Sequence, residues 1–300
     1  MENSVAILEN LGTQFETVDT IREQLFEVKK LQLHTGLEGF DSPKAFATFK
    51  NTGGNALGVV GDNFEPTQPV FLFDNFVESL MNTSADLNTL EYKELKGGAR
   101  IMLSANIGKF SYTNLQGKDD ELIMKINAVT GFDGTTKTSV FLSTYRMICA
   151  NGMKSWKTEY NLAFKNTKGN IGKANIMLNE VAKAINTQNK YKLFLKTLTT
   201  KKITTKEQNE YLQKVTGMNL KDYNALSTRS RNILDKINQS VAIEMQDAGA
   251  TAWALLNGIT RYTNHEVKST NKESFEYIYA GSGLNLNHDA QKVAFEMFCN

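Results

Sequence analysis

Four runs of strand-forming residues between positions 87 and 149 constrain the fold of this chain more than any other feature. They cover residues 87–95, 99–107, 121–129 and 136–149, and each is rich in β-branched and aliphatic side chains. Glycine or aspartate turn sequences separate them, at residues 96–98, 118–120 and 132–134. Short connections of this kind join antiparallel neighbours, so the runs predict an antiparallel β-meander.

The segments before the meander predict two helices and a hairpin. Thr20 and Glu23 form a capping box, and the following apolar spacing predicts a helix over residues 20–34 that Gly36 ends. Turn residues 51–55 lie between the strand-like sequences AFATFKN and ALGVV, which predicts a hairpin. Thr67 and Pro69 then introduce a helix over residues 69–81.

After residue 152 the period of the apolar residues becomes helical. Helices are expected at residues 173–198, 205–216, 227–238 and 242–263, and a last one after residue 287. The order of elements predicts an α+β fold, with an antiparallel sheet and flanking helices first and helices afterwards. We expect a sheet domain over residues 1–170 and a helical region over residues 171–300 packed on it, or one continuous domain.

The composition favours a globular protein that needs no metal or disulfide to fold. The chain has 300 residues, 41% of them hydrophobic, enough for a substantial core. It lacks an apolar stretch of bilayer length, and its N-terminus lacks the pattern of a signal peptide, so we expect a cytoplasmic protein without membrane contact. Cys149 and Cys299 are far apart, and the three histidines are scattered. We therefore expect no metal, no cofactor and no catalytic centre.

Charge is strongly segregated along the chain. Residues 144–206 contain 13 Lys and Arg against two acids, a net charge of +11, so the remainder carries −9 of the total of +2. Such a basic segment is either a phosphate-binding surface or a solvated helix face. Gly169 and Gly172, before the predicted long helix, form either a phosphate-binding nest or a plain loop. The spacing of a Walker motif is absent there.

Aromatic residues interleave with the basic ones, as in proteins that stack single-stranded bases. The candidate nucleic-acid-binding residues are Arg146, Lys154, Trp156, Lys157, Tyr160, Lys165, Lys168 and Lys173. Each ring could equally belong to the core. Arg146 either positions a phosphate or forms an ion pair with Asp133, because a strand arginine among apolar residues often needs a carboxylate partner.

Several motifs of this chain resemble the family known as domain of unknown function 932, which is associated with phages and plasmids. The resemblance runs over residues 56–296 and includes KGGARIMLSANI, GFDGTTKTSVFLSTYRMICANGM and ATAWALLNGITRYTNHEV. The matching positions are Gly61, Phe64, Gln68, Gly97, Gly98, Asp133, Gly134, Arg146, Cys149, Asn151, Thr167, Trp253, Asn257, Thr260, Tyr262 and His265.

This chain departs from the family pattern at three positions. Phe132 and Asn166 stand where the pattern has histidine, and Asn264 stands where it has aspartate. If those positions form a hydrolytic or metal centre in the family, this chain lacks ligands for it. The spacing of Trp253, Asn257, Tyr262 and His265 instead favours a packing seam between helices.

The resemblance implies a protein of a bacterial mobile element, and its order of elements is loosely similar to annealing proteins of the Rad52 type. The hypothesis from the sequence is binding of single-stranded DNA in recombination or replication, with no catalysis and with a homo-oligomer as an open alternative. A rival is a protein-binding module that acts on a host defence complex. Glu91 and Lys93 also match half of a metal-dependent nuclease motif.

Overall fold

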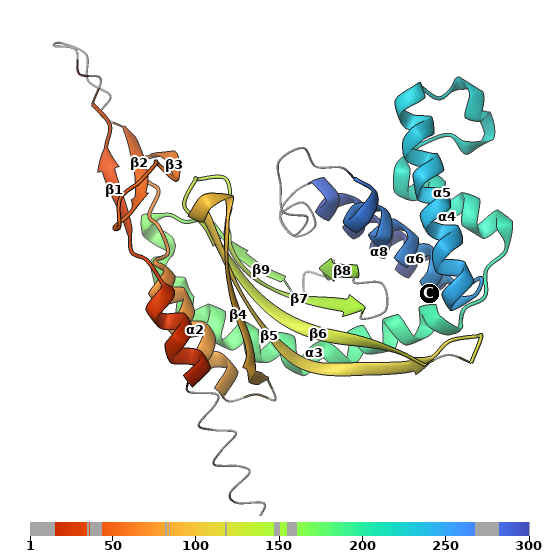
Figure 1. The fold of residues 1–300 in the computed structure, drawn as a ribbon, viewed down its shortest axis with the longest axis horizontal. Coiled ribbons are helices and arrows are strands. Elements are labelled where there is room, and N and C mark those ends of the chain that lie inside the picture. Colours follow the sequence, from red (N-terminus) through yellow and green to blue (C-terminus); the bar gives the residue numbers. More distant parts are fainter. Residues whose placement is uncertain are drawn as a thin grey trace, which may run out of the picture. The chain divides into compact units, whose positions relative to one another are not determined.

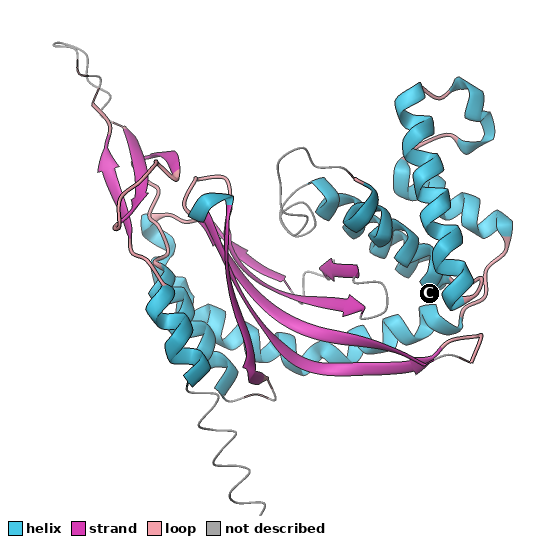
Figure 2. Cartoon of the chain, viewed as in Figure 1, coloured by secondary structure: helices cyan, strands magenta, loops and turns pink. Residues whose placement is uncertain are grey.

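The computed structural model describes residues 16–34, 36, 44–81, 83, 85–117, 119–146, 151–154, 161–267 and 282–299. It has two antiparallel sheets and a largely helical second half, so the predicted α+β class is confirmed (Figures 1 and 2). Among the described residues, no helix is long and apolar enough to cross a membrane.

A three-stranded sheet precedes the meander. It consists of β1 (Val28–Gln32), β2 (Ala45–Lys50) and β3 (Gly58–Gly61) in the order β1-β2-β3. The hairpin predicted around residues 51–55 is confirmed, because β2 and β3 pair antiparallel on either side of it. Ala47 is opposite Leu31 on one side and Val59 on the other, so these three side chains lie on one face.

The helix predicted over residues 20–34 is wrong in its position. Residues 16–24 are helical and β1 follows at residue 28. Thr20 does not cap this helix, since its hydroxyl donates to the carbonyl of Glu16 within it, 2.8 Å away. The Gln68 amide accepts from the Val28 N–H and donates to the Val28 carbonyl, each at 2.9 Å, which holds this segment as a strand.

The larger sheet is the predicted meander with two additions. Its strands are β4 (Asp86–Leu95), β5 (Arg100–Thr113), β6 (Asp119–Gly131), β7 (Thr138–Arg146), β8 (Asn151–Lys154) and β9 (Asn161–Phe164). The first five are neighbours in that order, and β9 pairs with the other end of β7. The short turn between β4 and β5 needs its two glycines, since Gly97 has φ 63° and Gly98 has φ 92°.

The predicted helix α2 (Pro69–Met81) is confirmed, and its buried face is mostly apolar. Leu72, Phe73, Phe76 and Leu80 recur at helical spacing and are each at most 1% exposed. Each side chain of this size contributes about 1.5–3 kcal/mol when it leaves water. The helix is therefore stabilised by its packing in the core.

The second half of the chain forms longer helices. They are α3 (Ala174–Thr200), α4 (Thr205–Thr216), α5 (Thr228–Ala248), α6 (Ala252–Arg261) and α8 (Ser282–Phe298), with a π-helical turn at Tyr262–Glu266 after α6. The helix predicted over residues 242–263 is interrupted. Gly249, with φ 74°, ends α5, and the Thr251 side chain caps α6 by accepting from the Ala254 N–H.

The chain forms two compact units. Unit 1 comprises Met1–Gly108, Lys125–Leu142 and Glu159–Ile185, and unit 2 comprises Lys109–Met124, Ser143–Thr158 and Asn186–Asn300. The chain thus passes between the units within β5, β6, β7 and α3. Secondary structure changes from strands to helices near residue 170, but both units contain strands of the larger sheet.

Candidate functional site

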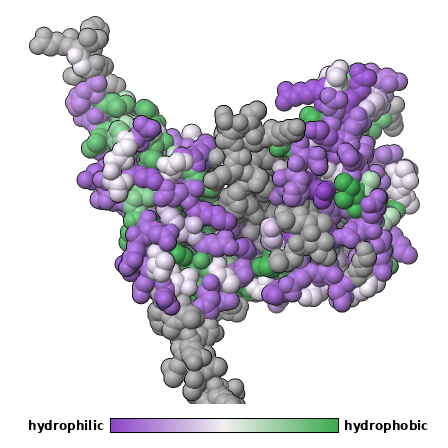
Figure 3. Space-filling model, in the orientation of Figure 1, coloured by the Kyte–Doolittle hydropathy of each residue, from purple (hydrophilic) through white to green (hydrophobic). Residues whose placement is uncertain are grey.

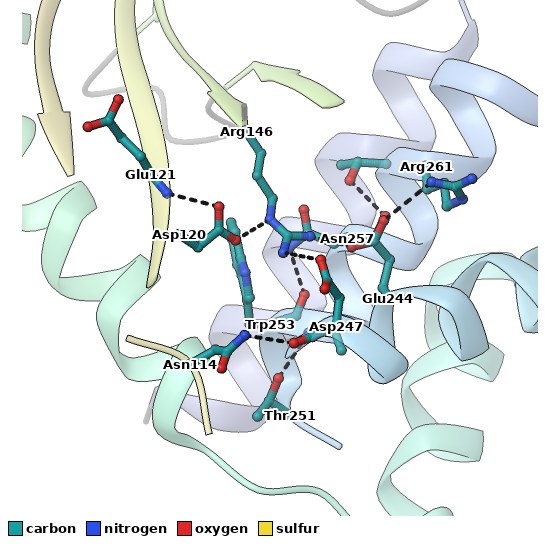
Figure 4. A network of polar contacts seen from close by, with 12 residues as sticks. Asn114, Asp120, Glu121, Arg146, Glu244, Asp247, Thr251, Trp253, Asn257 and Arg261 are labelled. Atoms are coloured by element: carbon teal, nitrogen blue, oxygen red, sulfur yellow. Dashed lines mark hydrogen bonds and ion pairs between the residues drawn. The ribbon is translucent and has the colours of Figure 1, made fainter. Parts of the chain in front are cut away.

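Arg146 is the centre of a buried polar network in unit 2 (Figure 4). It is the last residue of β7 and is 1% exposed. Its Nε lies 2.5 Å from an oxygen of Asp120, one Nη pairs with Glu244, and the other lies 3.4 Å from Asp247. Asp120 comes from β6, and the other two carboxylates come from α5. One guanidinium therefore joins two strands to a helix.

Aromatic and amide groups extend this network. The Tyr112 hydroxyl donates to Asp120 at 2.6 Å, and the Trp253 indole N–H donates to the Tyr112 oxygen. The two rings meet edge to face, with centroids 5.9 Å apart. The Asn114 side chain donates to the Asp247 carbonyl at 2.6 Å. These bonds join β5 and the turn after it to α5 and α6.

The two arginines of the network offset most of its negative charge. Arg146 and Arg261 face Asp120, Glu244 and Asp247, which gives a formal charge of −1. Burying such charges is costly unless each is paired. Burial raises the pKa of the Tyr112 phenol, the charge of Arg146 lowers it, and the hydrogen bond to Asp120 raises it again. The net pKa lies well above its ordinary value, so Tyr112 stays a neutral donor.

The prediction for Arg146 was right about the kind of partner and wrong about its identity. The guanidinium pairs with the three carboxylates above, whereas Asp133 lies 3.5 Å from Arg100 and 3.8 Å from Lys96. With 1% of its surface exposed, Arg146 is not placed to meet a phosphate. Its role in the folded chain is to neutralise buried acids.

Sequence reasoning missed the acids of this network, although a signal was present. The buried stripe of α5 contains Leu234, Ile237, Val241 and Ala248, and Glu244 lies in the same stripe. Asp120 is in phase with the buried Leu122, Met124 and Ile126 of β6. A carboxylate at an apolar position of a helix or strand predicts a buried cationic partner.

The Asp133 turn is held by its own hydrogen bonds in unit 1. One Asp133 oxygen accepts from the Thr135 N–H at 3.0 Å and from the Thr135 hydroxyl at 2.8 Å. β3 passes so close that a Cβ on Gly58 would lie 2.4 Å from the Asp133 Cα. Gly58 therefore allows β3 to lie directly against the Asp133 turn.

Asn166, which stands at a histidine position of the family pattern, has its hydrogen-bonding capacity filled. Its Oδ1 accepts from Thr138 at 2.5 Å and from Thr67 at 3.2 Å. Its Nδ2 lies 2.9 Å from the Gly131 carbonyl and 3.2 Å from the Thr136 carbonyl. The residue is 5% exposed, so it joins β-strand ends within the core of unit 1.

The remaining family-motif residues are mostly internal. Trp253 is 1% exposed and Asn257 is 3% exposed, and the Asn257 amide donates to the Trp253 carbonyl at 2.9 Å. Tyr262 is buried, whereas His265 is exposed. Asn151 pairs with Arg146 in the ladder of β7 and β8, and its side chain lies outside the description.

The structure places only part of the predicted basic surface. Lys165 and Lys168 are exposed in unit 1, and Lys168 lies 3.2 Å from Asp62. Trp156, Lys157 and Tyr160 lie outside the described residues, as do the side chains of Lys154 and Lys173. Nucleic-acid binding by these residues therefore stays a prediction.

Glu91 of the suspected nuclease motif is occupied by lysines. Its two oxygens lie 3.0 Å from Lys125 and 3.2 Å from Lys93. Burial raises the pKa of Glu91, but the hydrogen bonds and charges of these lysines outweigh it and lower the pKa below its ordinary value. In the described part of the chain, no group of three His, Cys, Asp or Glu side chains could hold a metal ion.

The arrangement is that of a mixed α+β protein with a buried ionic network. The chain belongs to the family described as Domain of unknown function (DUF932), whose model matches residues 56–280. No curated protein and no solved structure matches this chain. The family resemblance stated from the sequence is confirmed, and the family description carries no activity.

Proposed function

We propose that this protein binds single-stranded nucleic acid through lysines on the second half of α3, on the short segment after it and on α4. We call this set the α3–α4 lysines: Lys190, Lys192, Lys196, Lys202 and Lys206. They belong to unit 2, and they continue the basic segment beyond Arg146. The observation that carries the proposal is that these cations are solvent-accessible and have no acidic partner among the residues that the structure describes.

The packing of α3 directs its lysines outward. Tyr191, Phe194, Leu195 and Leu198 are buried at helical spacing, so the lysines between them occupy the opposite face. Lys190 and Lys196 are exposed and Lys192 is half-buried. Lys202 and Lys206, which follow in the chain, are also exposed. The part of the molecule around α4 and α5 is largely hydrophilic in Figure 3.

The described acidic residues in this part of the chain pair with lysines outside the α3–α4 set. Residues 186–216 contain seven lysines and two glutamates, a net charge of +5. Glu207 pairs with Lys201 at 3.3 Å and Glu210 pairs with Lys214 at 2.9 Å. Among the described residues, none of the α3–α4 lysines lies within ion-pair distance of a carboxylate. Each uncompensated lysine can displace a counterion from a phosphate, which is the main source of sequence-independent affinity.

We propose a single strand rather than a duplex as the ligand. Leu193 lies among the lysines of α3 and is 66% exposed, and contact with an unpaired base would remove its apolar surface from water. A role in recombination or replication of a bacterial mobile element, with self-association, is part of the proposal and rests on the sequence resemblance.

One observation favours a protein-binding function as the second candidate. On the three-stranded sheet, Leu31 is 53% exposed and Val59 is 64% exposed, on either side of the buried Ala47. An exposed apolar sheet face of this kind is typical of a protein contact. This face belongs to unit 1, so the two functions are separable by mutation.

The test is fluorescence anisotropy with a labelled single-stranded oligonucleotide at low and moderate salt. A triple variant, Lys192→Gln, Lys196→Gln and Lys206→Gln, removes three charges of the α3–α4 lysines. The matched control, Lys44→Gln, Lys137→Gln and Lys292→Gln, removes three exposed lysines elsewhere. We expect affinity to fall with salt and the logarithmic salt slope to drop by about 2 in the first variant only, at about 0.7 per lost phosphate contact. Equal effects of both variants, or no binding at low salt, contradict the proposal.

A further inference from the structure

A pocket lies beside the outer face of α4, within unit 2. Its volume is about 770 Å³, and it is lined by Lys206, Asn209, Glu210, Gln213, Lys214 and Leu220. This volume is in the range of small-molecule sites, roughly 300–1,000 Å³. None of its described lining residues belongs to the buried network or to the family motif.

The position of α4 explains why this polar face remains open. Tyr211, Leu212 and Val215 bury the inner face, and the Tyr211 hydroxyl donates to the Ala290 carbonyl of α8 at 3.1 Å. The lining residues of α4 recur at intervals of three and four, so they form one continuous stripe on the opposite side. Leu220, from the turn after α4, provides an apolar wall.

The lining offers three different interactions in one space. Asn209 and Gln213 are amides with both a donor and an acceptor, the arrangement that pairs with the N6 and N7 atoms of adenine. Lys206 and Lys214 lie at opposite ends of the stripe, about 12 Å apart along the helix at 1.5 Å per residue. Glu210 accepts from Lys214 at 2.9 Å, which leaves the lining with a net charge of +1.

We propose that this pocket receives a purine base with an exocyclic amine, adenine in particular, while Lys206 and Lys214 contact the adjoining phosphates. The inference rests on the proposed nucleic-acid binding, since Lys206 belongs to both surfaces. The base contacts Leu220 with its face and the two amides with its edge. The same chemistry is present in a strand of DNA or RNA and in a free nucleotide.

Filling the pocket separates base contacts from phosphate contacts. Gln213→Trp places an indole in the pocket from an exposed position, and Gln239→Trp on the exposed side of α5 is its matched control. The probes are a labelled oligo-dA of about 15 nucleotides, within the range of single-strand site sizes, and an abasic oligonucleotide with the same number of phosphates. A thermal melt of each variant checks that it folds.

We expect Gln213→Trp to weaken oligo-dA binding about tenfold, from the loss of one stacked base, and to leave abasic binding unchanged. The double variant Asn209→Ala, Gln213→Ala keeps the pocket open and should abolish the preference for oligo-dA over oligo-dT. Unchanged oligo-dA binding by Gln213→Trp overturns the pocket assignment while the proposed function stands.

A titration with AMP alone distinguishes a free nucleotide from a strand. AMP binding that Gln213→Trp abolishes, without oligonucleotide binding by the unmodified protein, supports the pocket for a free nucleotide and overturns the proposed function. Absence of binding to AMP and to both oligonucleotides overturns both. Each of the two proposals can therefore fail while the other stands.

Discussion

The Trp253 indole N–H donates a hydrogen bond to the phenol oxygen of Tyr112, although 141 residues separate the two in the chain. The Tyr112 hydroxyl donates in turn to Asp120, and the same Asp120 oxygen also accepts from the Arg146 Nε. The order of donors is fixed, because the indole can only donate and an ionised carboxylate can only accept. A neutral Tyr112 is the one group between them that can do both.

Replacing Arg146 by methionine should destabilise unit 2 severely. The change keeps much of the side-chain volume but leaves Asp120 and Glu244 buried without their shared cation, which costs about 3–5 kcal/mol. Arg229→Met, at an exposed position of α5, is the control and should change stability by less than about 0.5 kcal/mol. Urea denaturation followed by circular dichroism measures both, and a similar small loss in the two variants would contradict the structural role of Arg146.

Tyr112→Phe should lower the free energy of unfolding by about 1–3 kcal/mol, because it leaves the buried Trp253 N–H without an acceptor. The chain has two tryptophans, so the measurement is made in a Trp156→Phe background, where the fluorescence reports on Trp253 alone. Tyr223→Phe, which removes an exposed hydroxyl bonded to Asp235 at 2.8 Å, is the control. An unaltered Trp253 emission in Tyr112→Phe would argue against the hydrogen bond.

Tyr211 should make the stability of the protein depend on alkaline pH. Burial raises the pKa of its phenol well above the ordinary value, whereas the unfolded phenol ionises near about 10. The stabilisation is therefore complete below about pH 10 and is lost as pH rises further, by up to about 1.4 kcal/mol per pH unit. The advantage of the unmodified protein over Tyr211→Phe should shrink between pH 8 and pH 11, and a constant difference in urea denaturation across that range would contradict it.

Gly258→Ala should be destabilising even though alanine favours helices. A Cβ at Gly258 of α6 would lie 2.3 Å from a methyl carbon of Val241 and 2.7 Å from its Cα in α5. Overpacking of this kind costs about 1–3 kcal/mol, more than the gain of about 1 kcal/mol in helix propensity. Gly169→Ala, which meets nothing within 4 Å, is the control. Thermal unfolding compares the two, and a stabilised Gly258→Ala would show that α5 and α6 can separate there.

The elements that were predictable are those specified by local patterns. Alternation and turn residues gave the meander, and helical spacing gave α2 and α4, whose boundaries at Pro69 and Thr205 carry clear start signals. Residues 28–32 were misassigned because Val28, Leu31 and Leu33 fit a helical spacing, while the clamp that makes them a strand comes from Gln68, about 40 positions later.

The candidate sites were less predictable, because they depend on packing between distant segments. That Arg146 needed a carboxylate followed from its apolar neighbours, but the choice of Glu244 over Asp133 depends on where α5 lies. The outward direction of Lys196 could be read from the buried spacing of Tyr191, Leu195 and Leu198. The pocket could not, since Leu220 enters it from a turn with no periodic signal.

The chain crosses between its two units five times, at residues 108, 124, 142, 158 and 185. Truncation at residue 108, 124, 142 or 158 would give a fragment that lacks strands of unit 1, and truncation at residue 185 would remove most helices of unit 2. Neither unit is a single continuous segment of the chain, so neither can be transferred to another protein without part of the other.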